Sequence, residues 1–186
     1  MKNVKEFLVP TLTLCIICLV AAVLLAFTNQ VTEPRIAEIA AQAQEEAKKE
    51  VMPSAASFGE TFTDKASGCD YSEALSENGE VIGYAVTSTG KGGYSGDITL
   101  MVGVDADGKV VELSFLEINE TPSIGMKLTG NTEWLAQFAG LSGYAALGDN
   151  IDAVSGATKT SQGITDAVNN ALKCYDSISK EVGTDG

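Results

Sequence analysis

A short run near the C-terminus holds the side chains of this chain that are best suited to a chemical role. Asp152 is followed, after two intervening residues, by Ser155, Gly156, Ala157 and Thr158, where a helical stretch opens. Such an arrangement arises by chance in a chain of this length roughly once in several thousand sequences. The ordinary alternative is a glycine-containing turn before a helix, with Ser155 or Thr158 capping that helix.

The run resembles the recognition motif of proteins that carry FMN covalently, joined through its phosphate to the hydroxyl of the final Thr. In this chain that residue is Thr158. The resemblance implies that Ser155 and Gly156 make a tight turn exposing this hydroxyl, with Ala157 in the same cofactor-binding run. It also implies that Asp152 belongs to the recognition run rather than to redox chemistry. The N–H groups at the start of the next helix would favour the phosphate.

The chain contains no His. This excludes His-based acid–base catalysis, Ser-His-Asp and Cys-His nucleophiles, His-ligated haem and His-containing zinc sites. Since Thr is a poor nucleophile at neutral pH, the resemblance implies that a separate flavin transferase attaches FMN from FAD and releases AMP. We expect the neighbouring hydroxyls of Thr160 and Ser161 to cap the helix.

An apolar segment lies near the N-terminus. The 21 residues 7–27 carry no charge, and as a helix they would reach about 30 Å, the thickness of a bilayer's hydrocarbon core. A cleaved signal peptide usually has a shorter apolar region that ends at a small-x-small site. We therefore predict an uncleaved, single-pass anchor. Because Lys2 and Lys5 precede it, the N-terminus should be cytoplasmic and the remaining chain extracytoplasmic.

The rest of the chain is acidic. Residues 51–186 carry 7 Lys or Arg and 19 Asp or Glu, a net charge of −12 out of −13 for the whole chain. Such a surface repels nucleic acid and anionic lipid headgroups, so we expect neither as a partner.

Four cysteines are present. Cys15 and Cys18 lie in the apolar segment, where free Cys behaves as a small hydrophobe, and we expect no metal there. Cys69 and Cys174 lie in the exported domain and could form a disulfide if the compartment is oxidising, but the sequence leaves open whether they come within bonding range.

A second helix is predicted between the anchor and the folded domain. Thr32-Glu33-Pro34 is typical of a capped helix start, and apolar residues at helical spacing follow it. The helix should end near Met52-Pro53-Ser54. We therefore expect a tail and anchor at 1–28, a linker helix at 29–54 and a domain at 55–186.

Three strands are predicted in this domain, at 81–87, 98–104 and 110–118, with turns at Asn78-Gly79 and Asp105–Gly108. Strands this close along the chain favour an antiparallel sheet. Segments 131–140 and 161–179 are predicted to be helical, the second with an apolar stripe that packs on the sheet. The fold class is α+β.

Two further runs place the motif in an ordered series. Gly92–Ile98 leads into the hairpin of strands 98–104 and 110–118, and Glu120-Thr121-Pro122-Ser123-Ile124-Gly125 follows it. With the anchor and the Ser-Gly-Ala-Thr run, this series resembles the G subunit of the Rnf electron-transport complex, which is similar to the C subunit of the sodium-translocating NADH:quinone oxidoreductase. The resemblance covers essentially the whole chain. Ser123-Ile124 replace the family's usual Gly-Leu, so a positive φ at position 123 is in question.

The resemblance implies an electron-carrier subunit of an ion-translocating ferredoxin:NAD+ oxidoreductase coupled to Na+ or H+ movement. It would have no independent catalytic residues. Glu120, Thr121, Pro122 and Gly125 would line the flavin ring, while Tyr94 and Trp134 are weaker candidates for stacking on it. Partners would be the other membrane subunits, including the A and E subunits and the D subunit, which has a second covalent FMN.

No dinucleotide fingerprint and no Cys cluster suited to an iron–sulfur centre is present, so we expect this chain to bind neither NAD nor metal. Two alternatives stay open at this level. One is a stand-alone extracytoplasmic flavoprotein carrier with the same Thr158 chemistry. The other is a non-redox anchored surface protein of pilin type, although the chain lacks the pilin processing site.

Overall fold

A computed structural model describes residues 2–65 and 67–182 of the chain, with side chains from residue 7 to residue 180. It divides into two compact units, residues 1–42 and residues 43–186. The second unit therefore begins earlier than the predicted domain start near residue 55. The side chains of Lys2 and Lys5, on which the predicted orientation depends, lie outside the described residues.

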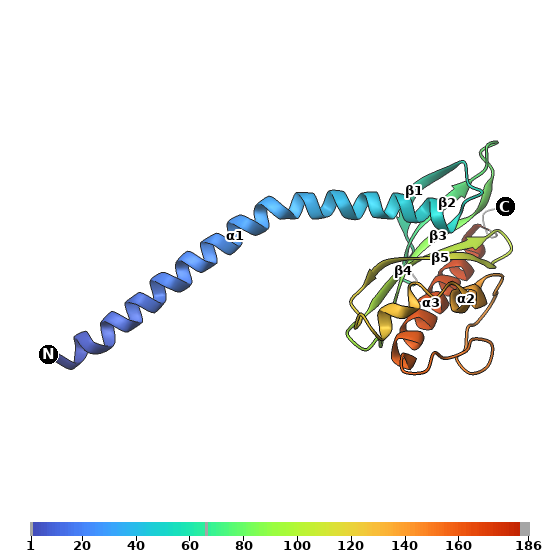
Figure 1. Ribbon diagram of the computed structural model, residues 1–186. Helices are drawn as coiled ribbons and strands as arrows, with labels where there is room; N and C mark the ends of the chain where they lie inside the picture. Colours follow the sequence, from blue (N-terminus) through green and yellow to red (C-terminus); the bar gives the residue numbers. More distant parts are fainter. Residues whose placement is uncertain (1, 66, 183–186) are drawn as a thin grey trace. The chain divides into compact units, whose positions relative to one another are not determined.

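The helix α1 runs without interruption from Lys2 to Val51 (Figure 1). The predicted separate helix start at Thr32 is therefore wrong, and Pro34 lies inside the helix. The Thr32 hydroxyl donates a hydrogen bond back to the Thr28 carbonyl at 2.9 Å, as a Thr inside a helix does, instead of capping the next turn. The predicted helix end near Met52 is confirmed.

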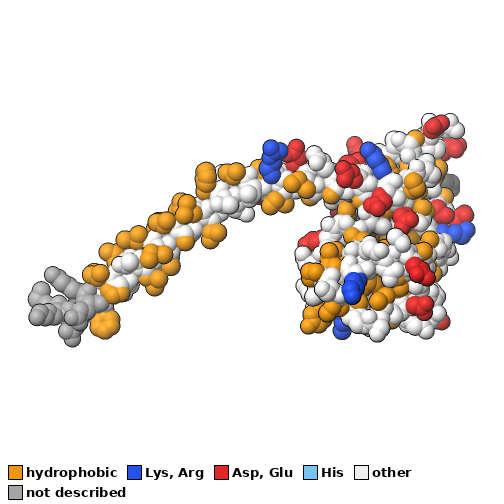
Figure 2. Space-filling view, viewed as in Figure 1, with side chains coloured by type: hydrophobic (Ala, Val, Ile, Leu, Met, Phe, Trp, Pro, Cys, Tyr) orange, Lys and Arg blue, Asp and Glu red, His pale blue; other side chains and the backbone are white. Residues whose placement is uncertain are grey.

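The N-terminal part of α1 is long and apolar enough to cross a membrane. Its most apolar stretch has a mean hydropathy of 2.8, and none of that stretch is buried in the protein. Figure 2 shows hydrophobic side chains around this part of the helix and charged side chains farther along it. In water this exposure would be costly, so the composition favours a lipid environment.

A five-stranded antiparallel sheet forms the centre of the second unit, with the strands in chain order. The strands are β1 (Ser57–Thr63), β2 (Asp70–Leu75), β3 (Val81–Gly90), β4 (Ile98–Asp105) and β5 (Val110–Ile118) (Figure 1). The three predicted strands and the antiparallel α+β class are confirmed. β1 and β2 were not predicted, because β1 is an edge strand of mostly exposed residues and β2 mixes polar with small side chains.

The predicted turn at Asp105–Gly108 joins β4 and β5. Gly108 has φ +79°, a left-handed conformation that glycine adopts without steric cost. Asp105 accepts hydrogen bonds through Oδ1 from the N–H groups of Asp107 and Lys109, at 2.9 and 2.8 Å. The turn signal in the sequence is thus an Asx-type turn that sets the hairpin register.

One face of the sheet packs against α3 (Thr158–Val182), which contacts β3 and β4. Alternate β4 residues point to this side: Ile98, Leu100, Val102 and Val104 are buried in one core cluster with the apolar face of α3. Three short helical segments add to this layer: η1 (Gly125–Leu128), α2 (Thr132–Leu135) and η2 (Ala136–Phe138). The predicted helical segment 131–140 is therefore two short helices.

The opposite face carries the last turns of α1, residues 43–51. Met101, between the α3-facing residues of β4, packs in a second cluster with Ala47, Val51 and Met52. This alternation is the period-two pattern of a sheet covered on both faces. The end of α1 is therefore a structural layer of the domain.

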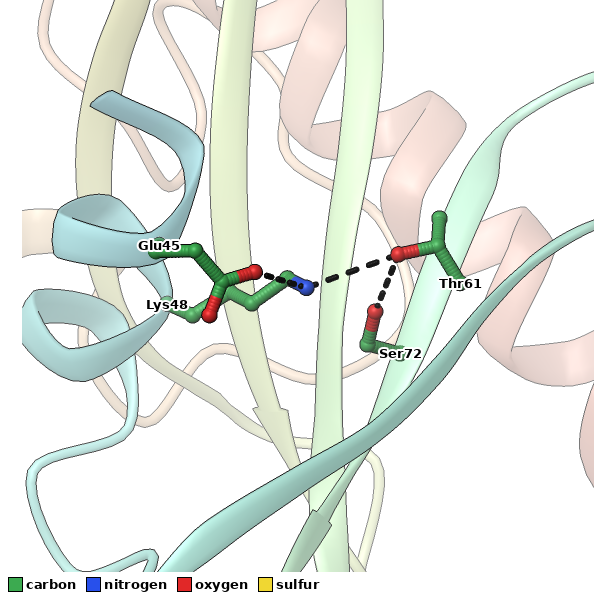
Figure 3. Close-up of polar contacts among 4 residues, drawn as sticks. All are labelled: Glu45, Lys48, Thr61 and Ser72. Atoms are coloured by element: carbon green, nitrogen blue, oxygen red, sulfur yellow. Dashed lines mark hydrogen bonds and ion pairs between the residues drawn. The ribbon is translucent and has the colours of Figure 1, made fainter. Parts of the chain in front are cut away.

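Polar contacts hold that layer across the sheet. The buried Lys48 donates to Glu45 Oε1 at 2.8 Å and to Thr61 Oγ1 at 3.4 Å, and the Thr61 and Ser72 hydroxyls are hydrogen-bonded at 2.9 Å (Figure 3). Toward the other edge, Ser114 on β5 donates to Glu50 at 2.6 Å. The bonds to Glu45 and Thr61 satisfy the Lys48 ammonium, which would otherwise be costly to bury.

Candidate functional site

The motif at 152–158 forms a tight turn directly before α3. The Ala157 N–H donates to the Val154 carbonyl at 3.0 Å, and Gly156 between them has φ +81°. A residue with a Cβ would be strained in this conformation. The turn leaves Thr158 exposed at the first position of the helix.

The start of α3 has unsatisfied backbone donors. Ala157 is the helix cap, because its carbonyl accepts the first helical bond, from Ser161 N at 2.9 Å. Its methyl side chain cannot accept a bond from the first turn. The N–H groups of Thr158, Lys159 and Thr160 are thus left for a partner outside the helix, and the helix dipole favours an anionic one. The Lys159 side chain adds a positive charge to this position.

The three hydroxyls of this turn are not equivalent. Thr158 is exposed, whereas Thr160 and Ser161 are 1% and 0% exposed. Ser161 Oγ donates to the Ala157 carbonyl at 3.1 Å and accepts from Val154 N at 3.3 Å, so it fastens the turn from within the helix. Of the three residues, Thr158 alone is exposed.

A buried carboxylate lies in the loop after β5. Glu120 is 7% exposed, and its Oε1 accepts from the N–H groups of Tyr94 and Ser95, at 2.6 and 3.4 Å. Its Oε2 is buried with no hydrogen-bond partner among the described residues. Leaving a buried acceptor unpaired costs about 1–3 kcal/mol, so this oxygen is ready for a donor from a ligand.

Two glycines make room for this carboxylate. A Cβ on Gly93 would lie 2.6 Å from Glu120 Oε1. A Cβ on Gly125 would lie 2.8 Å from Glu120 Oε2 and 2.7 Å from Thr160 Oγ1. The runs 92–98 and 120–125 and the start of α3, which are far apart in the sequence, therefore meet around Glu120.

A cavity of about 330 Å³ opens at this meeting point. Tyr94, Glu120, Thr121 and Ile124 line one part, and residues 156–160 line the other. Its volume is at the lower end of the range for small-molecule sites. The cavity combines apolar side chains, an unpaired acceptor and a helix start that favours phosphate. A flavin mononucleotide has an apolar ring, an imide N–H donor and a phosphate, so these residues fit that group.

The structure brings together most of the predicted site residues. Those that line the cavity are Glu120, Thr121, Gly156, Ala157 and Thr158. Gly125 is buried against Glu120 and Thr160. Pro122 and Ser155 are exposed and are not among the residues that line it.

Asp152 lies on the approach to the turn. Its carbonyl accepts a bond from Trp134 Nε1 at 2.5 Å, and its N–H donates to Gln137 Oε1 at 2.9 Å. The carboxylate itself is exposed and makes no bond with the described part of the chain. Trp134, considered for ring stacking, is instead buried beside Phe138 with ring centroids 5.3 Å apart. It is a core residue.

Tyr94, considered above for ring stacking, lines the cavity, and three further lining residues were absent from the predicted site: Ile124, Lys159 and Thr160. The signal for Lys159 and Thr160 lay in their adjacency to Thr158. Ser123, which stands where the family usually has Gly, causes no backbone strain, because no non-glycine residue in the described part of the chain has a positive φ.

Fold and site together define a flavin-binding domain that follows an apolar N-terminal helix. Residues 93–173 match the FMN-binding domain model, and residues 1–51 match the RnfG N-terminal region. The first match contains Glu120 and Thr158.

The chain belongs to the family of G subunits of ion-translocating oxidoreductase complexes of the Rnf type. It is 36% identical to the G subunit of the Na+-translocating ferredoxin:NAD+ oxidoreductase complex of Acetobacterium woodii, over 91% of each chain. It is 32% identical to the G subunit of the ion-translocating oxidoreductase complex of Methanosarcina acetivorans, over 92% of this chain and 96% of that one. The G subunit of the proton-translocating ferredoxin:NAD+ oxidoreductase complex of Clostridium ljungdahlii is 29% identical, over 92% and 93%.

Proposed function

We propose that this chain is an electron-carrier subunit that holds FMN covalently at Thr158. The observation that carries the proposal is the exposed Thr158 hydroxyl, at a helix start with free N–H groups and beside a cavity suited to a flavin ring. FMN supplies the redox chemistry when bound. The chain supplies its position and, through Glu120 and the helix start, the electrostatic surroundings that set its potential.

Attachment requires a second protein. In a flavin transferase acting on FAD, the Thr158 Oγ1 forms a bond to the phosphorus of the FMN half. The bond from that phosphorus to the AMP half breaks, and the hydroxyl proton leaves to a base. The exposed Asp152 carboxylate, which makes no bond within the described part of the chain, is available for recognition by the transferase.

The whole protein acts in an Rnf-type complex that couples ferredoxin oxidation and NAD+ reduction to ion movement. The names of the relatives support membership in such a complex. One name specifies Na+ and another specifies protons, so the coupling ion is either of the two. The partners are the other membrane subunits, including the A and E subunits and the D subunit, which carries the second covalent FMN. The N-terminus is cytoplasmic, and the FMN domain lies on the extracytoplasmic side of the membrane.

The covalent bond can be tested on a denaturing gel viewed under ultraviolet light. From a host that contains the transferase, the wild-type band fluoresces. Thr158→Ala loses all fluorescence and keeps its stability within about 1 kcal/mol, because the Thr158 hydroxyl is exposed at the first position of α3 and surface substitutions of this kind cost little. Asp152→Ala gives a weaker band. Fluorescence of Thr158→Ala equal to the wild type would disprove the assignment.

Trypsin provides the matched control. It cleaves after Lys159 and thus separates Thr158, in peptide 128–159, from Thr160 and Ser161, in peptide 160–173. We expect the added FMN mass on the first peptide, and Thr160→Ala to keep it there. An FMN mass on the second peptide would show that the site is wrong, although the chain carries a covalent flavin.

Membership of the complex is tested by solubilisation in mild detergent. Fluorescent protein that co-purifies with several integral membrane subunits supports the relay role. A flavoprotein that purifies alone from the same membranes supports the stand-alone carrier instead.

A further inference from the structure

Two cysteines far apart in the sequence lie side by side in the core. Cys69 ends the turn between β1 and β2, and Cys174 lies on α3. Cys69 Sγ is 4.0 Å from the carbonyl of Asn170, one turn before Cys174, and both cysteines are buried in the same core cluster. Both are free thiols, 7% and 0% exposed.

Further contacts hold the turn against the helix. Asp64 accepts bonds from the N–H and the hydroxyl of Ser67, and its other oxygen accepts from Ser177 on α3 at 3.2 Å. The turn that carries Cys69 is therefore held against the segment of α3 that carries Cys174, which is the proximity that a disulfide needs.

The pair also has the chemical asymmetry of a reactive dithiol. The hydrogen bond from Cys174 lowers the pKa of Cys69 from 9.0 to about 7, while the same contact and burial raise the pKa of Cys174. Cys69 is thus the thiol that becomes the nucleophile. A cavity of about 330 Å³, lined by Ser67, Asn170, Lys173 and Ser177, opens where the turn meets α3, next in the chain to Cys174, and offers an approach for a small oxidant.

We propose that Cys69 and Cys174 are a disulfide site that fastens the β1–β2 turn to α3 when the domain meets a low-molecular-weight disulfide. This rests on the extracytoplasmic placement proposed above, where such oxidants persist. The Cys69 thiolate attacks the oxidant and releases one thiolate. Cys174 then loses its proton and displaces the second thiolate as the new S–S bond forms. Two thiols of the chain are oxidised, and one disulfide is reduced to two thiols.

The cross-link would tie the edge of the sheet to α3, the helix that begins at Thr158. β1 is an exposed edge strand. The turn after β1 contacts α3 through Asp64, which accepts a hydrogen bond from Ser177, and through Cys69, which lies against the Asn170 carbonyl. The closed loop from Cys69 to Cys174 contains every residue that lines the candidate flavin cavity, from Tyr94 to Thr160. Closing a loop of this length stabilises a domain chiefly by restricting its unfolded state.

The test uses the full-length protein in detergent. The protein is treated with oxidised glutathione to give the oxidised sample, and part of it is then treated with dithiothreitol to give the reduced sample. After oxidation, acid quenching, blocking of free thiols and trypsin digestion, we expect peptides 66–91 and 174–180 to be joined, two hydrogens lighter than their sum. Cys15 and Cys18 should be blocked in the same sample. The oxidised protein should melt about 5–15 °C above the reduced protein.

Cys69→Ser and Cys174→Ser are the matched controls, and neither should show a difference between the two treatments. The proposal is overturned if excess oxidant gives no joined peptides, or only glutathione adducts, or if the joined protein melts no higher than the reduced protein. The gel fluorescence of the flavin attached at Thr158 is measured on the same samples. A chain that is cross-linked but not fluorescent would contradict the FMN assignment and leave the disulfide standing. A chain that is fluorescent but not cross-linked would contradict the disulfide and leave the FMN assignment standing.

Discussion

At the scale of single residues, Glu120 should set the properties of the bound flavin. Glu120→Gln removes a negative charge beside the cavity and keeps an oxygen for the Tyr94 N–H. We expect full covalent attachment and a higher midpoint potential, since a nearby negative charge disfavours the electron-rich reduced ring. An interaction of roughly 1–2 kcal/mol corresponds to about 20–45 mV for a two-electron couple. Spectroelectrochemical titration measures it.

The control for this experiment is Glu117→Gln. It removes the same charge from an exposed residue whose carboxylate accepts a hydrogen bond from Asn119 Nδ2 at 3.3 Å. Its potential should match the wild type. Equal potentials for Glu120→Gln and the wild type would show that Glu120 does not act on the ring.

Gly125 is the second residue whose role can be isolated. In Gly125→Ala the new Cβ would lie 2.6 Å from Glu120 Cβ and 2.7 Å from Thr160 Oγ1. Overpacking of this kind costs about 1–3 kcal/mol. Thermal unfolding should show that loss, whereas Gly130→Ala, where a Cβ meets nothing within 4 Å, should unfold like the wild type. Equal melting of the two variants would contradict the tight packing.

At the scale of elements, the position of α3 depends on glycines where it crosses β3. A Cβ on Gly90 would overlap the Gly163 carbonyl and lie 2.6 Å from Ala167 N. Gly90→Ala must therefore push α3 away from the sheet, at a cost of about 3 kcal/mol in the free energy of unfolding. Chemical denaturation measures this cost, and flavin attachment should fall as well, because α3 carries Thr158.

The matched strand control is Gly59→Ala in β1. Its Cβ would meet Glu73 at an ordinary contact distance of 3.6 Å. Its stability should stay within about 0.5 kcal/mol of the wild type. If Gly90→Ala were equally mild, the close approach of helix and sheet would not be a requirement of the fold.

At the scale of the whole molecule, the end of α1 belongs to the domain. A fragment beginning at Ala43 keeps the buried Ala47, Val51 and Met52, whereas one beginning at Ala55 loses all three. At about 1.5–3 kcal/mol for each large buried side chain, the shorter fragment should lose about 3–6 kcal/mol in stability. Urea unfolding of the two fragments compares them. Equal midpoints would show that the helix end contributes nothing.

The local signals were readable from the sequence alone. Short-range patterns predicted the apolar helix, three strands and the Asp105–Gly108 turn, because alternation and turn chemistry act over a few residues. The motif at 152–158 was readable for the same reason, since its turn and helix start are local. The start of a helix at Thr32 was wrong because Pro34 is tolerated inside α1, and polar edge strands such as β1 carry no hydrophobic period.

Only the tertiary structure decided what these segments form together. Glu120 meets the start of α3 because glycines at 93 and 125 leave space for its carboxylate, and no local pattern encodes that contact. The residues 43–51 join the domain because their apolar side chains match one face of the sheet. Cys69 and Cys174 lie in one core cluster because α3 packs along β3 and β4. Each contact joins residues far apart in the chain, so its geometry depends on packing the whole sheet between two layers.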